Sequence, residues 1–209
     1  REYIDPVRYI SNESSGKQGY AIAEALSRLG IETTLITGPT DLVSNKDIKI
    51  KKIITASEMF EIVKKSLPVD IAVCAAAVTD FKPVYKSKSK LKKDNLRLKS
   101  FELQKNIDIL EFLGKNNKHR PKIVIGFAAE TENLDKNALS KLKQKNCDII
   151  IANDVSKKDS GFNSDYNRVS IIDNSGKIKV VKKNKKSFIA NIIADIILDK
   201  LLINDRSFN

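Results

Sequence analysis

Cysteine and histidine are scarce in this sequence, which has two cysteines and one histidine among 209 residues. Cys74 and Cys147 lie far apart, neither belongs to a Cys-x-x-Cys pair, and His119 stands alone, which excludes a zinc site of the usual kind. Both cysteines lie in or beside apolar runs, where a free thiol behaves as a small hydrophobic group. Free thiols suit a reducing compartment, so we expect a cytoplasmic protein.

Long hydrophobic runs are also missing, since none approaches the roughly 20 apolar residues that cross a bilayer. The most apolar helical stretch, Phe188 to Ile203, is interrupted by Asn191, Asp195 and Asp199, and we expect it to pack as a helix on a core. The sequence shows no signal-peptide pattern. Because it opens at Arg1 rather than Met, we expect it to be a piece of a longer protein.

Acidic residues are outnumbered, with 26 Asp and Glu against 38 Lys and Arg and a net charge of +12. Such an excess can indicate nucleic-acid binding, which would give oligonucleotide affinity a steep salt dependence. Arginine, the preferred reader of base edges and phosphates, is nevertheless rare. The lysines accompany many Asn and Ile residues, as AT-rich coding produces, so general polynucleotide binding is disfavoured and the clustering of lysines is the more informative feature.

Short apolar runs alternate with amphipathic helical stretches along the chain. This alternation predicts an α/β fold whose mostly parallel sheet carries helices on both faces. Helices are expected over Tyr20–Leu29, Ala56–Leu67, Asn133–Lys145 and Lys186–Leu202, and strands over Glu32–Thr37, Val69–Val78, Lys122–Ala129 and Asp148–Ala152.

Two segments depart from this alternation. Asn95 to Leu103 alternates apolar with polar residues, and Arg168–Asp173 and Lys177–Val181 flank an Asn-Ser-Gly hairpin signal. We expect residues 94–104 and 166–182 to form a small antiparallel β-arm beside the sheet. The hypothesis is that this arm serves dimerisation.

Ligands of doubly wound sheets bind at the carboxyl ends of the strands, where helices begin. The loop before the first helix carries Ser14, Ser15 and Gly16, which offer two hydroxyl groups, a flexible turn and a positive helix end to a phosphate. Its spacing matches neither the dinucleotide fingerprint nor the Walker A loop. A helix start capped by serine would explain the same residues, and both interpretations stay open.

Two buried strands end in small residues followed by a carboxylate. The segment Cys74–Phe81 contains three alanines, which let a flat ring approach the backbone, and Asp80, which could hold a metal or a ribose. Gly126–Thr131 repeats the pattern. Tight core packing followed by a helix cap is the alternative.

The segment Lys82 to Lys93 contains six lysines and no acid. Charge runs of this kind are usually solvated, but a lysine-rich loop after a nucleotide-sized pocket could also close over a triphosphate. The sequence offers no nucleophilic triad and no convincing acid–base pair. Phosphate binders without a nucleophile suit a reaction driven by positioning and charge neutralisation.

Five motifs, in order, resemble phosphopantothenoylcysteine synthetase, and the resemblance covers nearly the whole chain as one domain, residues 1–209. These motifs are Asp5–Asn12 with Ser14–Lys17, Ala76–Asp80, Lys90–Lys93, Gly126–Thr131, and Ala152–Val155 with Gly161–Asp165. The resemblance implies a Rossmann-like three-layer fold, a homodimer, and fusion in bacteria to a flavin-dependent decarboxylase. It also implies a ligase that uses CTP and Mg²⁺ to form an acyl-cytidylate of 4′-phosphopantothenate, which L-cysteine converts to the amide.

The resemblance also implies roles for individual residues, without assigning metal ligands. Arg8, Asn12 and Lys90 would be catalytic, with Asn12 orienting the acyl-cytidylate and Lys90 neutralising phosphate charge. Asn12, Ser14, Ser15 and Gly16 would bind substrate or phosphate. The nucleotide would contact Cys74, Ala75, Ala76, Asp80, Lys90, Ile107, Asp108, Ile109, Leu110, Phe127, Lys141 and Lys145.

The sequence departs from the family pattern in two places. Ile107 stands where a proline is common, and the Gly-Gly-Thr turn that ends the family's first strand would lie before Arg1, so we expect that strand upstream. Two other readings stay open. A pyridine-nucleotide reductase would need a Gly-rich fingerprint that is not found here. A noncatalytic nucleotide-binding partner on the same fold is disfavoured by the presence of Asn12, Asp80 and Lys90.

Overall fold

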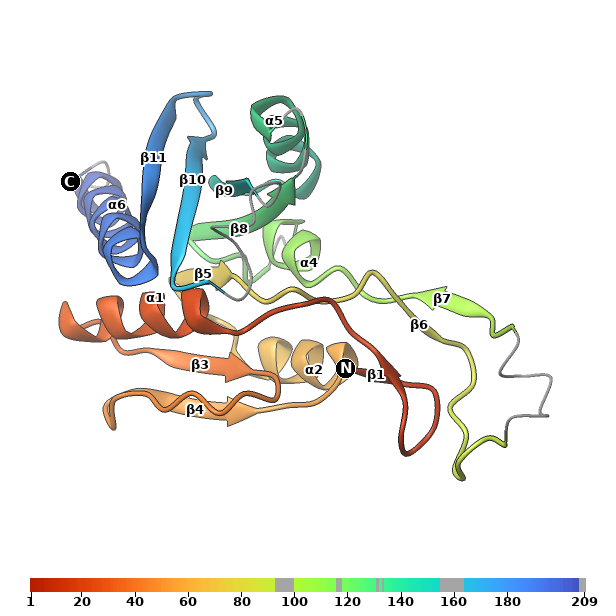
Figure 1. Cartoon of the computed structure of the whole chain (residues 1–209). Helices are drawn as coiled ribbons and strands as arrows, with labels where there is room; N and C mark the ends of the chain where they lie inside the picture. The colour runs from red at the N-terminus through yellow and green to blue at the C-terminus, as the bar shows by residue number, and fades with distance from the viewer. Residues whose placement is uncertain (93–99, 116–117, 131, 133, 155–163, 207–209) are drawn as a thin grey trace.

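The computed structural model describes residues 1–92, 100–115, 118–130, 132, 134–154 and 164–206 (Figure 1). The helices of this part are α1 (Lys17–Arg28), α2 (Ala56–Ser66), α4 (Ile109–Lys115), α5 (Leu134–Lys145) and α6 (Lys186–Arg206). The strands are β1 (Glu2–Tyr3), β2 (Tyr9–Ile10), β3 (Thr34–Thr37), β4 (Lys49–Lys52), β5 (Ile71–Cys74), β6 (Phe81–Pro83), β7 (Leu103–Lys105), β8 (Ile123–Glu130), β9 (Ile149–Asp154), β10 (Tyr166–Asp173) and β11 (Ile178–Lys185).

The main sheet has the strand order β11-β10-β9-β8-β5. β5, β8 and β9 pair in parallel, while β10 pairs antiparallel with both of its neighbours, so four of the five strands point the same way. The predicted α/β fold with a mostly parallel sheet is therefore confirmed.

The hairpin expected over residues 166–182 forms, but its predicted place in a β-arm was wrong. β10 and β11 extend the main sheet beyond β9. The reason is burial. Val169 and Ile171 pack in the apolar cluster on one face of the sheet and Ile172 in the cluster on the other. Only a strand covered on both faces can bury all three side chains, and a solvated arm cannot.

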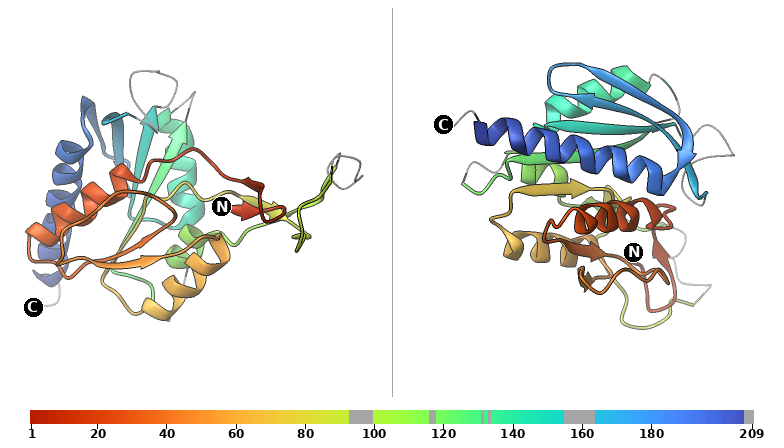
Figure 2. Two further views of the ribbon diagram at one scale, coloured as in Figure 1. Left: turned by 60° about the horizontal axis from the view of Figure 1, so that its bottom comes forward. Right: turned by 90° about the vertical axis from the view of Figure 1, so that its left-hand side faces the viewer.

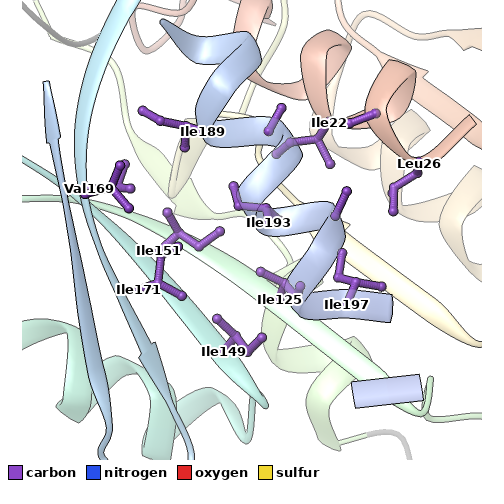
Figure 3. Packing of buried hydrophobic residues seen from close by; sticks show 14 of the residues in the cluster. Ile22, Leu26, Ile125, Ile149, Ile151, Val169, Ile171, Ile189, Ile193 and Ile197 are labelled. Atoms are coloured by element: carbon purple, nitrogen blue, oxygen red, sulfur yellow. The ribbon is translucent and has the colours of Figure 1, made fainter. Parts of the chain in front are cut away.

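Helices cover both faces of the main sheet, which gives three layers (Figure 2). α1 and α6 lie together on one face, where Ile22, Leu26, Ile189 and Ile193 join the sheet residues in one cluster (Figure 3). α4 and α5 cover the other face through a second cluster. The predicted helix over 186–202 is α6, and no helix in the described part of the chain is long and apolar enough to cross a membrane.

β3 and β4 form a separate parallel pair, and β3 is not hydrogen-bonded to β5. A cavity of about 2010 Å³ is lined by residues of both strands. The strand predicted over Val69–Val78 is shorter than expected, because β5 ends at Cys74. The alanines that follow have low strand propensity and leave the sheet to line the cavity.

A thin projection does leave the body of the molecule, and it is built by β6 and β7, which pair antiparallel (Figures 1 and 2). Leu103, the last residue of the strand predicted over Asn95–Leu103, begins β7. Residues 95–99 of that prediction lie outside the described residues, as do Lys93, Thr131, Val155 and residues 161–163 of the motifs.

Candidate functional site

The first helix begins next to the alanine-rich end of β5. Gly16, in the left-handed conformation with φ 74°, precedes α1, and no side chain caps the helix. The alternative of a serine-capped start is therefore wrong: the Ser14 hydroxyl accepts a hydrogen bond from the Gly16 amide instead (3.3 Å). Without such a cap, the positive end of α1 is suited to an anion from the cavity.

Contacts between α1 and the segment after β5 bring two predicted loops together. A Cβ placed on Gly19 would lie 3.9 Å from the Cβ of Ala75, so α1 passes close to this segment. Upstream of the helix, Asn12 Nδ2 donates to the carbonyl oxygen of Val78 (3.2 Å). The two motifs that the sequence predicts as ligand loops therefore share one wall of the cavity.

Most of the predicted site residues line this single cavity. Arg8 and Lys90 are not among its lining residues. Those that line it are Asn12, Ser14, Ser15, Gly16, Cys74, Ala75, Ala76, Asp80, Ile107, Asp108, Ile109, Leu110, Phe127, Lys141 and Lys145.

Two glycines let α4 lie close to its neighbours, the sheet and α5. A Cβ on Gly126 would overlap the Leu110 side chain and lie 2.8 Å from Cδ1 of Ile150, so only glycine lets Leu110 pack on β8. A Cβ on Gly114 would overlap the carbonyl oxygen of Lys145. The first close approach places the first turn of α4 on β8, and the second places its last turn beside the end of α5.

Lys145 is consequently paired with two carboxylates, that of Asp108 just before α4 and that of Glu111 in its first turn. Its Nζ lies 2.9 Å from Asp108 Oδ2 and 2.8 Å from Glu111 Oε2. Burial works against the Lys145 charge, but the hydrogen bonds with Glu111 and Asp108 outweigh it and raise the pKa of the ammonium group. Hydrogen bonds from Lys115 and Lys145 lower the pKa of Glu111 to about 2. Lys145 is thus a fixed, fully charged group on the cavity wall.

Asp108 has a second task, because its Oδ1 accepts a hydrogen bond from the Glu111 amide and so caps α4 (2.8 Å). Lys141, one turn before Lys145 on α5, donates through Nζ to the carbonyl oxygen of Phe127 (3.1 Å). The predicted nucleotide contacts of α4, α5 and β8 therefore form one connected group.

The thiol of Cys74 is unreactive. Burial raises the pKa of its thiol to about 12, so the thiol stays protonated and is a poor nucleophile. This agrees with a nucleotide contact rather than a covalent role. Within the described residues, no three His, Cys, Asp or Glu side chains gather in a way that could hold a metal ion.

Two residues of the site were missed by sequence reasoning. Glu2 is buried, and its Oε1 accepts hydrogen bonds from the Ala56 amide (2.8 Å) and from Asn106 Nδ2 (3.5 Å). Asn106 also donates to the Thr79 carbonyl (2.9 Å), and its amide donates to the Asp80 carbonyl (2.8 Å). These bonds fix the backbone around Asp80. A polar residue next to Ile107 was the only hint in the sequence.

Arg8 and Lys90 lie together, outside the lining of the cavity. Arg8 Nη2 donates to the carbonyl oxygen of Leu91, the residue after Lys90 (2.6 Å). Arg8 also pairs with Asp5 Oδ2 (2.8 Å). Lys90 itself is exposed.

A mostly parallel sheet between two helix layers, with a cavity that runs along β3 and β5 and is lined at one end by the loops before α1 and after β5, defines an α/β protein with a Rossmann-like fold. The chain belongs to the family described as the DNA/pantothenate metabolism flavoprotein C-terminal domain, which matches residues 1–201.

Named relatives agree with this assignment. Over 198 residues, 94% of this chain, it is 41% identical to the "Coenzyme A biosynthesis bifunctional protein CoaBC" of Haemophilus influenzae and 43% identical to that of Borreliella burgdorferi. The chain spans about half the length of the curated relatives it matches, 49% in both cases. A crystal structure of the C-terminal domain of CoaBC is similar at a TM-score of 0.79 and 34% identity, covering 98% of this chain and 91% of that one.

Proposed function

We propose that this chain is a phosphopantothenate–cysteine ligase of coenzyme A biosynthesis that works in the cytoplasm and uses CTP. In the first step, a carboxylate oxygen of 4′-phosphopantothenate attacks the α-phosphorus of CTP, and pyrophosphate leaves. In the second, the amine of L-cysteine attacks the acyl carbon and loses a proton, and CMP leaves with the carboxylate oxygen. The product is 4′-phospho-N-pantothenoylcysteine.

The observation that carries the proposal is the meeting of Asn12, the alanines after β5, Phe127 and the two α5 lysines around one cavity. The small side chains of Ala75 and Ala76 leave room for a flat ring. Lys141 supplies positive charge, which favours the polyphosphate and the charge that develops on it, whereas the charge of Lys145 is offset by Asp108 and Glu111. The amide of Asn12 can donate to the carbonyl oxygen of the acyl-cytidylate.

We include Mg²⁺ because enzymes normally bind a nucleoside triphosphate as its Mg²⁺ complex. Mg²⁺ binds through one or two carboxylates, phosphate oxygens and water, and would offset charge on the leaving pyrophosphate. Asp80 fits this need, since it is exposed on the cavity wall. The Asp108 and Glu111 carboxylates are engaged by Lys145 instead.

We further propose that the chain is fused to a second domain and forms a homodimer. Homologues named as bifunctional, of which this chain spans half, support fusion to a flavin-dependent decarboxylase. The family resemblance suggests a homodimer. Exposed apolar side chains on and beside the projection, among them Val84, Tyr85 and Leu103, would suit an interface there.

A pyrophosphate-release assay on the protein in its full-length form tests the proposal. Release should require CTP, Mg²⁺ and 4′-phosphopantothenate together, and CMP should appear in equal amount once cysteine is added. Equal rates with ATP would refute the choice of CTP but not the ligase activity. CTP binding without release from any nucleotide would favour the noncatalytic nucleotide-binding partner instead.

A further inference from the structure

A buried carboxylate outside the cavity ties together the two segments that carry Arg8 and Lys90. Asp5 is fully buried. Its Oδ1 accepts hydrogen bonds from the amides of Val7 and Arg8, both at 2.9 Å. Its Oδ2 accepts one from the amide of Leu91 at 3.2 Å and lies 2.8 Å from Arg8 Nη2. One side chain thus serves two segments 86 residues apart.

Further hydrogen bonds join the same two segments. Arg8 Nη2 donates to the carbonyl oxygen of Leu91 (2.6 Å), so the amide and the carbonyl of Leu91 are both held. Four residues earlier, the amide of the buried Ser87 donates to the carbonyl oxygen of Ile4 (2.9 Å). The stretch 87–91 is therefore hydrogen-bonded at both of its ends to residues 4–8, and the exposed Lys88 and Lys90 lie between these hydrogen bonds.

The carboxylate keeps its charge in this setting. Burial opposes ionisation of Asp5, but the amides of Val7, Arg8 and Leu91 and the Arg8 guanidinium outweigh it and lower its pKa. Hydrogen bonds to an ionised group are stronger than those between neutral groups. An asparagine here keeps the size of the side chain and loses that strength.

We propose that Asp5 is a positioning residue for Lys90: through Arg8 and the Leu91 backbone it fixes the lysine-bearing stretch 87–91 for work on the triphosphate. This role rests on the proposed function. A lysine side chain is flexible, so an anchored backbone lowers the entropy lost when its ammonium group meets a phosphate. Asp5 itself does not line the cavity.

A double-mutant cycle tests this role in the protein that carries the full chain. Asp5→Asn should lower kcat/KM for CTP in pyrophosphate release by roughly tenfold, the size of one charged hydrogen bond. In the Lys90→Gln background the same change should lower it no further, because its effect passes through Lys90. Equal fold-losses in both backgrounds would mean that Asp5 only stabilises the fold, and would overturn the proposal. Asp41→Asn, which neutralises an exposed carboxylate, is the matched control and should change nothing.

Two further measurements keep the test decisive. Trypsin cleavage after Lys88 and Lys90, followed by mass spectrometry, should become roughly tenfold faster in Asp5→Asn and stay unchanged in Asp41→Asn. Cleavage needs no turnover, so it tests the anchoring even if the wild-type protein releases no pyrophosphate, and unchanged cleavage overturns it. If Asp5→Asn does not fold, Leu91→Pro removes the one amide donor that Asp5 receives from the stretch 87–91. It should give the same loss of kcat/KM and the same faster cleavage after Lys88, which is the bond to follow because trypsin does not cut between Lys90 and a proline.

Discussion

Asn12 and Val78 are joined across the candidate site, because Nδ2 of Asn12 donates to the Val78 carbonyl oxygen at 3.2 Å. The two residues come from the loops before α1 and after β5, so this bond aligns the predicted catalytic amide with the alanine-rich wall. The amide keeps a second N–H and a carbonyl oxygen for a ligand.

Asn12→Asp should separate the two half-reactions. The aspartate cannot donate to Val78 or to an acyl carbonyl, and its charge opposes a developing oxyanion, so the cysteine step should slow by roughly 10²–10³. Acyl-cytidylate should then accumulate, as seen by mass spectrometry before cysteine is consumed. Asn174→Asp, at the exposed β10–β11 turn, introduces the same charge and should behave as wild type. Loss of pyrophosphate release in Asn12→Asp would place Asn12 in the first step instead.

Glu111 predicts how stability changes with pH. Its pKa is lowered from 4.5 to about 2 in the folded protein, so its ion pairs stabilise the fold above pH 4.5. That contribution is lost as the pH falls from 4.5 through 2. The Tm difference between wild type and Glu111→Gln should thus be constant above pH 4.5 and shrink towards pH 2. A difference of equal size at every pH from 2 to 8 would contradict the ion-pair assignment.

The close packing around Gly114 predicts that a larger residue at this position destabilises the protein. Any Cβ here overlaps the Lys145 carbonyl oxygen and comes within 2.8 Å of the Asn146 carbonyl oxygen, and backbone cannot give way as a side chain can. Gly114→Ala should destabilise the protein by at least about 1–3 kcal/mol in chemical denaturation. Gly38→Ala, where a Cβ meets nothing within 4 Å, should be close to neutral. Equal effects would refute the close approach of α4 and α5.

The packing of α6 should contribute a large part of the free energy of unfolding. Ile193 is 2% exposed and lies between α1 and the sheet (Figure 3). Ile193→Ala should cost about 2–5 kcal/mol of unfolding free energy. Ile178→Ala, which truncates the same side chain at a position 40% exposed, should cost far less. Similar losses for the two variants would show that the core lies elsewhere.

The sequence was sufficient for the elements with a strong apolar pattern. The run Lys122–Ala129 became β8, and the amphipathic stretches Ala56–Leu67 and Asn133–Lys145 became α2 and α5. Burial on both faces of a strand leaves a continuous apolar run, and burial on one face of a helix leaves a helical period. Two-residue strands such as β1 and β2 leave none. α4 was also missed, since seven residues are too few to show a helical period.

Tertiary structure determines which strands pair and which charges meet. This explains the remaining differences between the sequence-based predictions and the structure. The hairpin signal at residues 174–176 was correct, but nothing local says that β10 pairs with β9. Lys145 was predicted at the site from the family resemblance, while its pairing with Asp108 and Glu111 depends on the close approach at Gly114.

Isotope transfer tests the acyl-cytidylate route most directly. The protein is given 4′-phosphopantothenate labelled with ¹⁸O in its carboxylate, together with CTP, Mg²⁺ and cysteine, and the products are analysed by mass spectrometry. Attack on the α-phosphorus predicts one ¹⁸O in each CMP and none in pyrophosphate. Label in inorganic phosphate with release of CDP, or CMP without label, would contradict the proposed reaction.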